Sequence, residues 1–161
     1  MMSDVNFNVV LFRPEIPQNT GNIGRLCVGT HCRLHLVHPL GFDLSEKQLR
    51  RAGLDYWQHL DVREHENWQP TDVDRTFFFS KKATRSVFDI EFMPGDTLVF
   101  GSETKGLPDD MRFENQERCV ALPHYGPVRS HNLANSVSAA VYLGLKDLHD
   151  RGLAISAKPL S

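Results

Sequence analysis

Apolar and polar residues along the chain predict strands that alternate with helices. Short apolar runs indicate buried strands at about 6–12, 33–37, 75–80, 97–101 and 119–122. A helix is expected at 19–30, a shorter one at 45–51, and the last segment shows the clearest helical spacing. Its apolar positions recur every three or four residues: Ala134, Val137, Val141, Leu145 and Leu148. The pattern predicts an α/β fold with a mostly parallel sheet flanked by helices.

The length of the chain suits one globular domain over residues 1–161. Its residues are 40% hydrophobic and 24% charged, a composition that can form a substantial core. Residues 153–161 show no periodicity and are expected to form a loose tail. No apolar run approaches the roughly 18 residues of a membrane-spanning helix. The first residues, Met1 to Asp4, lack the basic and apolar regions of a signal peptide. We therefore expect a cytoplasmic protein that does not enter a membrane.

Charge and metal-binding residue types narrow the possible partners. The formal net charge is −2, so the chain has no general attraction to nucleic acid, and any RNA site must be local. His31 and His35 are spaced as on one helix face, but a strand that starts at Arg33 separates them, so no metal site is predicted. Three cysteines form no CxxC pair, which argues against a disulfide framework and a zinc site: Cys27, Cys32 and Cys119.

Polar residues and glycines gather in three loops that follow predicted strands. Ligands of parallel sheets bind beyond the carboxyl ends of the strands. The central loop carries Gly101, Glu103 and Gly106 directly after a buried strand. Glycine lets backbone approach a ligand closely, although glycines in turns are equally often structural.

The other two loops each precede a helix. Residues 17–25 begin a helix whose free amide groups can bind an anion, although a capped helix start with Asn19 or Thr20 explains them as well. Residues 122–136 place serine, histidine and asparagine before the last helix. Ser130 or Asn132 can serve as its N-cap. The loop at 17–25 lacks the spacing of a dinucleotide or phosphate-binding motif.

Taken together and in this order, the three loops resemble the motifs of the SPOUT superfamily of RNA methyltransferases. Its early N-x-G-N-x-x-R matches Asn19 to Arg25, its central G-x-E-x-x-G matches Gly101 to Gly106, and its late S-x-N matches Ser130 to Asn132. The segments 14–23 and 49–56 further resemble small single-domain members of the superfamily. Those members methylate the ribose 2'-hydroxyl of the wobble nucleotide, a cytidine or uridine, in the tRNA anticodon loop.

The resemblance implies a trefoil knot in the C-terminal half, a homodimer, and S-adenosylmethionine (SAM) as methyl donor without a metal. It implies a set of SAM-binding residues: Phe79, Gly101, Gly106, Leu122 and Ser130. It also implies a set of catalytic residues: Arg25, Asn19, Glu103 and Asn132.

Chemistry refines the roles of two of these residues. A guanidinium with a pKa above about 12 is a poor base, so we expect Arg25 to bind a phosphate and to stabilise the developing alkoxide. Glu103 can act as a general base or can accept hydrogen bonds from backbone amides, and the structural role is favoured. The chain departs from the superfamily pattern at Gly24, where isoleucine is common, and at His131, where an apolar residue is usual.

Local basic and aromatic side chains are candidates for binding the tRNA substrate. Tyr56, Trp57 and Tyr125 can stack on unpaired bases, although packing within the protein is the favoured role of the first two. Two other functions stay open at this point: methylation of another tRNA or rRNA position, and binding of RNA or a nucleotide without catalysis. The basic candidates are Arg50, Arg51, Lys81, Lys82, Arg85, Lys105, Arg112 and Arg129.

Overall fold

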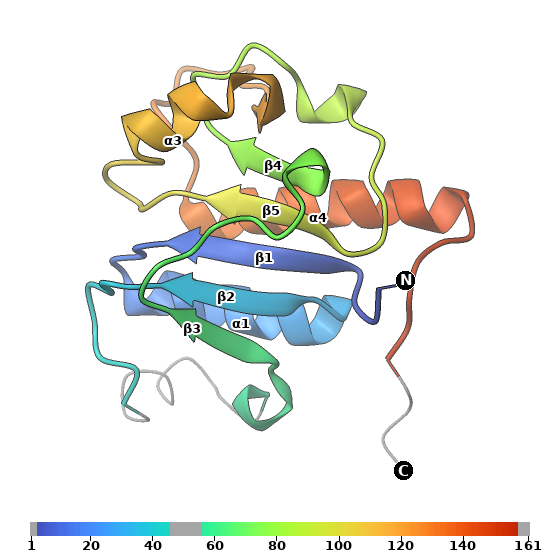
Figure 1. Ribbon diagram of the computed structural model, residues 1–161, viewed down its shortest axis with the longest axis horizontal. Coiled ribbons are helices and arrows are strands. Elements are labelled where there is room, and N and C mark those ends of the chain that lie inside the picture. Colours follow the sequence, from blue (N-terminus) through green and yellow to red (C-terminus); the bar gives the residue numbers. More distant parts are fainter. Residues whose placement is uncertain (1–2, 46–55, 158–161) are drawn as a thin grey trace.

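A six-stranded parallel sheet forms the centre of the protein, in a computed structural model that describes residues 3–45 and 56–157 (Figure 1). The strands lie in the order β3-β2-β1-β5-β4-β6, and every neighbouring pair is parallel, which confirms the predicted fold class. The strands are β1 (Phe7–Phe12), β2 (Arg33–Val37), β3 (Val62–His65), β4 (Thr76–Phe79), β5 (Asp96–Phe100) and β6 (Cys119–Val120).

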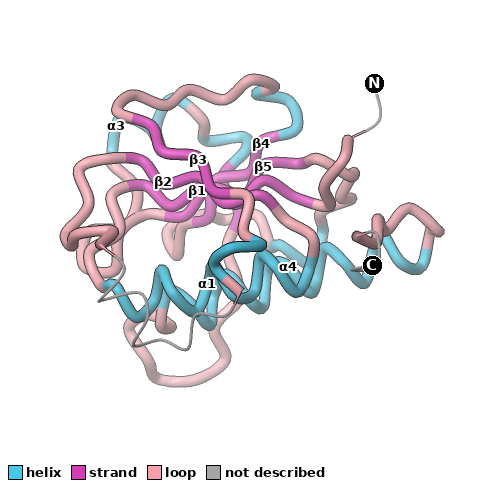
Figure 2. Tube along the Cα trace, turned by 90° about the horizontal axis from the view of Figure 1, so that it is seen from below, coloured by secondary structure: helices cyan, strands magenta, loops and turns pink. Residues whose placement is uncertain are grey.

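Helices cover the sheet on both faces. The two long helices, α1 (Pro17–Thr30) and α4 (Leu133–Asp150), lie together on one face, and α3 (Asp109–Glu114) lies beyond the other (Figure 2). The short helix expected at 45–51 falls outside the described residues except for Ser45. Four 3-10 turns complete the fold: η1 (Trp57–His59), η2 (Val73–Arg75), η3 (Val87–Asp89) and η4 (Gln116–Arg118).

Burial on both faces explains why the central strands are apolar at nearly every position. Alternate residues of β1 point to opposite sides, so Val9 joins the cluster beneath α1 and α4 while Val10 joins a second cluster with Val99 and Leu107. The predicted inner residues of α4 are buried apart from Leu145, which is partly buried. The two clusters hold the sheet rigid beneath the loops at its carboxyl edge.

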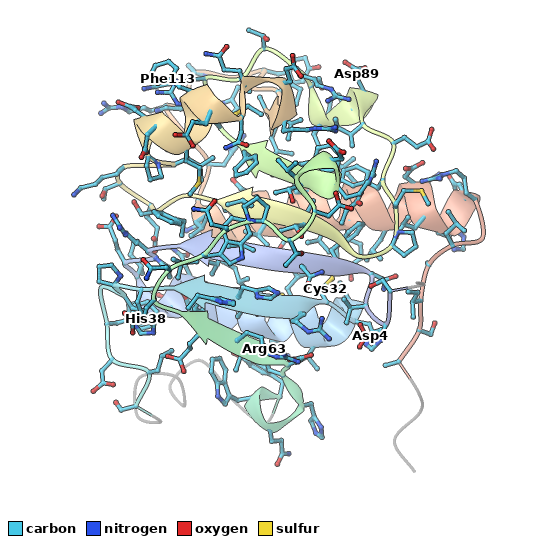
Figure 3. The ribbon with its side chains drawn as sticks, in the orientation of Figure 1. Asp4, Cys32, His38, Arg63, Asp89 and Phe113 are labelled. Atoms are coloured by element: carbon cyan, nitrogen blue, oxygen red, sulfur yellow. The ribbon has the colours of Figure 1, made fainter. Side chains whose placement is uncertain are left out.

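The edge strand β3 was not predicted, because its sequence Val62-Arg63-Glu64-His65 contains one apolar residue. Pairing with β2 and side-chain contacts hold it at the edge of the sheet. Asp61 accepts hydrogen bonds from Arg33 Nε at 2.7 Å and Arg63 Nε at 2.8 Å. Figure 3 shows Arg63 on β3 and His38 close to the end of β2.

A polar chain links β1, β2 and β3 through His35. The Asn8 amide nitrogen donates to Gly95 O (3.1 Å), so its oxygen faces His35 Nε2 at 2.9 Å and accepts a hydrogen bond from it. His35 Nδ1 then accepts from His65 Nε2, also at 2.9 Å. This arrangement fits a neutral imidazole, and burial followed by the charge of His65 lowers the pKa of His35 to about 4.

The lowered His35 pKa predicts a loss of stability in mild acid. Between the ordinary pKa of 6.5 and about 4, the unfolded chain binds a proton that the folded chain excludes. The stabilisation is therefore present above pH 6.5 and is lost as the pH falls toward 4. After allowance for solvent screening, we expect urea unfolding to show a decrease of about 1–2 kcal/mol across this window. The decrease should be absent in His35→Gln; parallel profiles for the two proteins would exclude His35 as the cause.

The start of the expected loose tail is attached to the sheet. Ile155 N donates to Asn6 Oδ1 at 2.7 Å, and Asn6 Nδ2 donates back to Ile155 O at 2.8 Å. Leu153 packs against the core, and its amide donates to Leu148 O. Residues 153–155 thus belong to the ordered domain, while 158–161 lie outside the described residues.

Candidate active site

A cavity of about 770 Å³ opens where β4, β5 and β6 end, on the side to which the arrows of Figure 1 point. Glu103 and Asn132 line it, and Asn19 contacts both of them. All five predicted SAM-binding residues also line it: Phe79, Gly101, Gly106, Leu122 and Ser130. The sheet therefore brings together residues that are separated by more than fifty positions in the sequence.

Aromatic and aliphatic side chains form the apolar wall of the cavity. The rings of Phe79 and Phe100 are stacked, with centroids 4.6 Å apart and planes 15° from parallel. Leu107 and Leu122 add aliphatic surface, while Ser130 contributes a hydroxyl group. A pocket that joins apolar walls to placed polar groups is typical of sites for small molecules and cofactors.

Gly101 is required by the fold of its own loop rather than by a ligand. A Cβ atom there would lie 2.0 Å from the backbone C of Gly106 and 2.1 Å from Leu107 N. Gly106 N donates to Ser102 O (2.9 Å), so the loop returns directly over its start. Gly106 has a φ of 66°, which glycine adopts without strain, and the space around it is open.

Glu103 holds the residues that precede helix α1 from a distant part of the chain. Its Oε1 accepts from Glu15 N at 2.9 Å, and its Oε2 accepts from Ile16 N at 2.7 Å and Asn19 Nδ2 at 3.2 Å. The helix begins at Pro17, so Asn19 and Thr20 lie inside its first turn and the prediction that one of them is the N-cap is wrong. Ile16 is at the N-cap position and offers no side-chain hydrogen bond. The favoured reading of Glu103 as an acceptor of backbone amides is confirmed, and its negative charge complements the amino end of the helix.

Asn19 and Asn132 extend this chain of hydrogen bonds to the last loop. Because the Asn19 amide group donates to Glu103, its oxygen is free to accept from Asn132 Nδ2 at 3.1 Å. Asn132 Oδ1 in turn accepts from Asn135 N and caps α4, as predicted. One continuous network thus fixes the three motif loops relative to one another.

Glu15 is a residue of the site that the sequence did not reveal. Its Oε1 accepts from the Thr104 hydroxyl at 2.6 Å and from Thr104 N at 3.3 Å. The Thr104 hydroxyl is the main cause that lowers the pKa of Glu15. Glu15 and Glu103 therefore bind the central loop and the α1 loop to each other in both directions.

Of the four predicted catalytic residues, Glu103 and Asn132 line the cavity and Asn19 is hydrogen-bonded to both, whereas Arg25 neither lines it nor bonds to a residue of this network. Its side chain is exposed on α1, where its charge partly opposes the burial that raises the pKa of Tyr56. The Tyr56 hydroxyl donates to Gly21 O. The favoured packing role of Tyr56 is confirmed. Within residues 3–45 and 56–157, Arg25 forms no hydrogen bond or salt bridge.

Gly24 makes room for the aromatic residues that pack on α1. A Cβ atom at Gly24 would lie 3.1 Å from Leu60 Cδ2 and 3.3 Å from the ring of Trp57. This explains why the chain departs from the common isoleucine. The segment around η1 takes the space that the larger side chain would occupy.

Substitutions at Gly24 are expected to show this close packing. Gly24→Ile should lower the free energy of unfolding by about 1–3 kcal/mol, because it displaces Trp57 and Leu60. Gly29→Ala is the matched control on the same helix, since nothing lies within 4 Å of its added methyl group. It should stabilise the protein by about 1 kcal/mol through helix propensity. Equal effects of both substitutions in urea unfolding would contradict the packing account.

Basic and histidine side chains surround the mouth of the cavity. The rings of His124 and His131 are in contact, with centroids 4.3 Å apart. Of the predicted RNA-binding residues, five line the cavity: Lys81, Lys82, Lys105, Arg112 and Arg129. A mildly acidic protein thus presents a positive rim where its polar loops meet. Arg50 and Arg51 lie outside the described residues.

Within residues 3–45 and 56–157, no cluster of three or more His, Cys, Asp and Glu side chains is arranged to hold a metal ion. The three cysteines are buried and unpaired, and burial raises the pKa of each thiol. No helix in these described ranges has the length and apolar character needed to cross a membrane.

The family model described as "SpoU rRNA Methylase family" matches residues 6–142, which is most of the chain. The chain belongs to this family. The fold is also similar to that of a solved structure described as "Structural insights into the 2-OH methylation of C/U34 on tRNA". That protein is 40% identical to this chain, and the two structures match with a TM-score of 0.85 over 92% of this chain and 100% of that one. The resemblance to the SPOUT superfamily is confirmed.

Two further proteins are similar to this chain, one in sequence and one in fold alone. A protein of Burkholderia ambifaria named tRNA (cytidine(34)-2'-O)-methyltransferase is 47% identical over 144 residues, 84% of this chain and 92% of its own length. The SpoU methyltransferase AviRb of Streptomyces viridochromogenes, solved with AdoMet, is 23% identical with a TM-score of 0.72 over 92% of this chain and 59% of its own. The second likeness shows the fold alone.

Proposed function

We propose that this chain transfers the methyl group of SAM to the ribose 2'-hydroxyl of the wobble nucleotide, a cytidine or uridine, in the tRNA anticodon loop. The observation that carries the proposal is the single hydrogen-bonded network of Glu103, Asn19 and Asn132, which holds three motif loops around one cavity. The Burkholderia ambifaria relative is named for this reaction, and the structure at 40% identity concerns the same hydroxyl group.

The cavity fits SAM in both size and chemistry. Phe79, Leu107 and Leu122 would hold the adenine against an apolar wall, and the backbone of the 101–106 loop with Ser130 would meet the polar parts of the molecule. Bound SAM supplies a methyl group activated by a positively charged sulfur. The protein's part is to hold the ribose hydroxyl in line with that group, and placement of this kind supplies much of the acceleration of a two-substrate reaction.

The residues divide into a positioning set and a charge-stabilising group. Both oxygens of Glu103 already accept hydrogen bonds from amide groups, which favours a role in positioning the loops over removal of the proton of the ribose hydroxyl. Arg25 is the exposed cation that binds the neighbouring phosphate and stabilises the alkoxide as it develops.

A homodimer is part of the proposal, because Arg25 does not line the cavity of its own chain. A second copy packed against helices α1 and α4 would bring Arg25 of one subunit to the cavity of the other. Exposed apolar side chains at the start of α1 and on α4 support such an interface: Ile16 (44% exposed), Tyr142 (58%) and Leu143 (36%). A tRNA substrate also places the proposed activity in the cytoplasm.

A transfer assay with a matched RNA pair tests the reaction class. Purified protein and isotopically labelled SAM are incubated with an anticodon stem-loop, and with the same RNA carrying a 2'-deoxy wobble nucleotide. The ribose substrate should take up label and the deoxy substrate should take up none. Equal labelling of both RNAs would place the methyl group elsewhere and contradict 2'-O-methylation.

A further inference from the structure

A second cavity, of about 570 Å³, lies beside the first at the ends of β1 and β2. The segment Ser102–Leu107 forms a wall of both cavities, since all six of its residues line the first and four of them also line the second. On its other side the second cavity is lined by Phe12, Arg13 and the turn from Pro39 to Gly41. A ligand in the second cavity is therefore a direct neighbour of a ligand in the first.

The second cavity is lined by two cations, Arg13 and Lys105. Among the described residues, neither the Arg13 guanidinium nor the Lys105 ammonium forms a salt bridge. Of the two carboxylates in the lining, Asp109 is paired, since its Oδ1 lies 2.5 Å from Arg112 Nη2. Glu15 keeps its charge, accepts from the Thr104 hydroxyl and interacts with the charge of Lys105. Arg13 and Lys105 outnumber this one remaining carboxylate, so the cavity favours an anionic ligand, with Arg13 as its main cation.

Arg13 is held in a backbone conformation that side chains rarely adopt. Its φ is 56°, and its amide donates to Val37 O at 3.0 Å, which fixes the turn at the end of β1. The guanidinium carbon lies 4.9 Å from the centroid of the Phe12 ring. A strained position that costs free energy persists where the surroundings enforce it, and such positions concentrate at ligand sites. Here the strain places a cation beside an aromatic ring at the rim of the cavity.

We propose that the second cavity is a subsite for an RNA nucleotide adjacent to the one that is methylated. Its phosphate lies between Arg13 and Lys105, and its base lies against Phe12 and Pro39. This inference rests on the proposed function. The first cavity holds SAM, and the ribose that is methylated has to reach the methyl group at its mouth. The shared 102–107 wall therefore places a nucleotide in the second cavity next to the methylated one on the same strand.

Three variants separate charge from backbone geometry at Arg13. Arg13→Asn removes the charge but keeps a residue that tolerates positive φ, and Arg13→Lys restores the charge. Arg63→Gln removes an exposed arginine on the distant strand β3 and serves as the matched control. We expect Arg13→Asn to weaken binding of an anticodon stem-loop by about tenfold and to raise its KM with little change in kcat. SAM affinity should be unchanged, and Arg13→Lys should recover most of the RNA affinity.

The contact with a phosphate is tested on the RNA itself. The salt dependence of binding should fall by about 0.7–0.9 in log–log slope for Arg13→Asn. A scan of neutral methylphosphonates through the anticodon loop should find one position that weakens wild-type binding and leaves Arg13→Asn unaffected. Equal RNA affinity of wild type and Arg13→Asn, with methyl transfer intact, would overturn the subsite alone. Failure of the wild type to methylate any tRNA would overturn the proposed function and the subsite with it.

Discussion

Arg25→Ala is expected to lower the rate of methyl transfer by about 10²–10³-fold while SAM binding stays at its wild-type level. The loss follows from removing the charge that stabilises the developing alkoxide, an effect of this size for one preorganised donor. SAM affinity is preserved because Arg25 of the second subunit is proposed to meet the RNA phosphate and the developing alkoxide, whereas the residues proposed to hold SAM come from the cavity of one chain. Single-turnover transfer with labelled SAM measures the rate, and calorimetric titration measures the affinity.

Arg25→Lys provides the matched control for this first expectation. Lysine keeps the positive charge but loses the planar, bidentate geometry, so we expect it to recover only part of the rate. The free energy of unfolding should change by less than about 0.5 kcal/mol in both variants, because the side chain is exposed. Loss of SAM affinity in Arg25→Ala, with the rate restored at saturating SAM, would show that the assigned role is wrong.

Glu103→Gln is expected to damage stability and turnover together. The carboxylate accepts two backbone amides and the Asn19 side chain, and a glutamine NH₂ group would turn a donor toward one of these donors. Loss of these charge-assisted bonds should lower the free energy of unfolding by about 1–3 kcal/mol. Because Asn19 then loses its fixed orientation toward Asn132, we expect transfer to fall by about 10²-fold.

The alternative role of Glu103 makes a different prediction. A general base would give a similar loss of rate without a loss of stability, and it would also remove a limb of the pH–rate profile. Glu64→Gln, at an exposed carboxylate on β3, controls for the general effect of removing a negative charge. An unchanged free energy of unfolding in Glu103→Gln, with the rate reduced, would contradict the positioning role.

Local pattern was sufficient to predict the buried strands and the long helices. The apolar runs of β1, β4 and β5 are set by burial on both faces, and the spacing of Val137, Val141 and Leu148 is set by one buried face of α4. Strand β3 was missed because an edge strand with exposed faces needs few apolar residues. The trefoil knot stays a prediction, since strand order and register do not define chain threading.

The site was harder to predict where its contacts are distant in sequence. The motifs led to Glu103 and Asn132, but the hydrogen bonds that precede α1 join Glu103 to Glu15 and Ile16 across 88 and 87 positions, and no local signal indicates that pairing. The positive φ of Arg13 was equally hidden, because it depends on the bond to Val37 O on β2. Gly101 was recognised as a close-approach position, whereas only the structure shows that the approaching group is the loop itself.

The central claim is methylation of one ribose hydroxyl at the wobble position of tRNA. Its most direct test is mass spectrometry of nucleosides and mapped fragments from a tRNA pool incubated with the purified protein and isotopically labelled SAM. We predict label in 2'-O-methylcytidine or 2'-O-methyluridine within the fragment that contains the wobble nucleotide. Label on a base, or on a ribose in any other fragment, would contradict the claim.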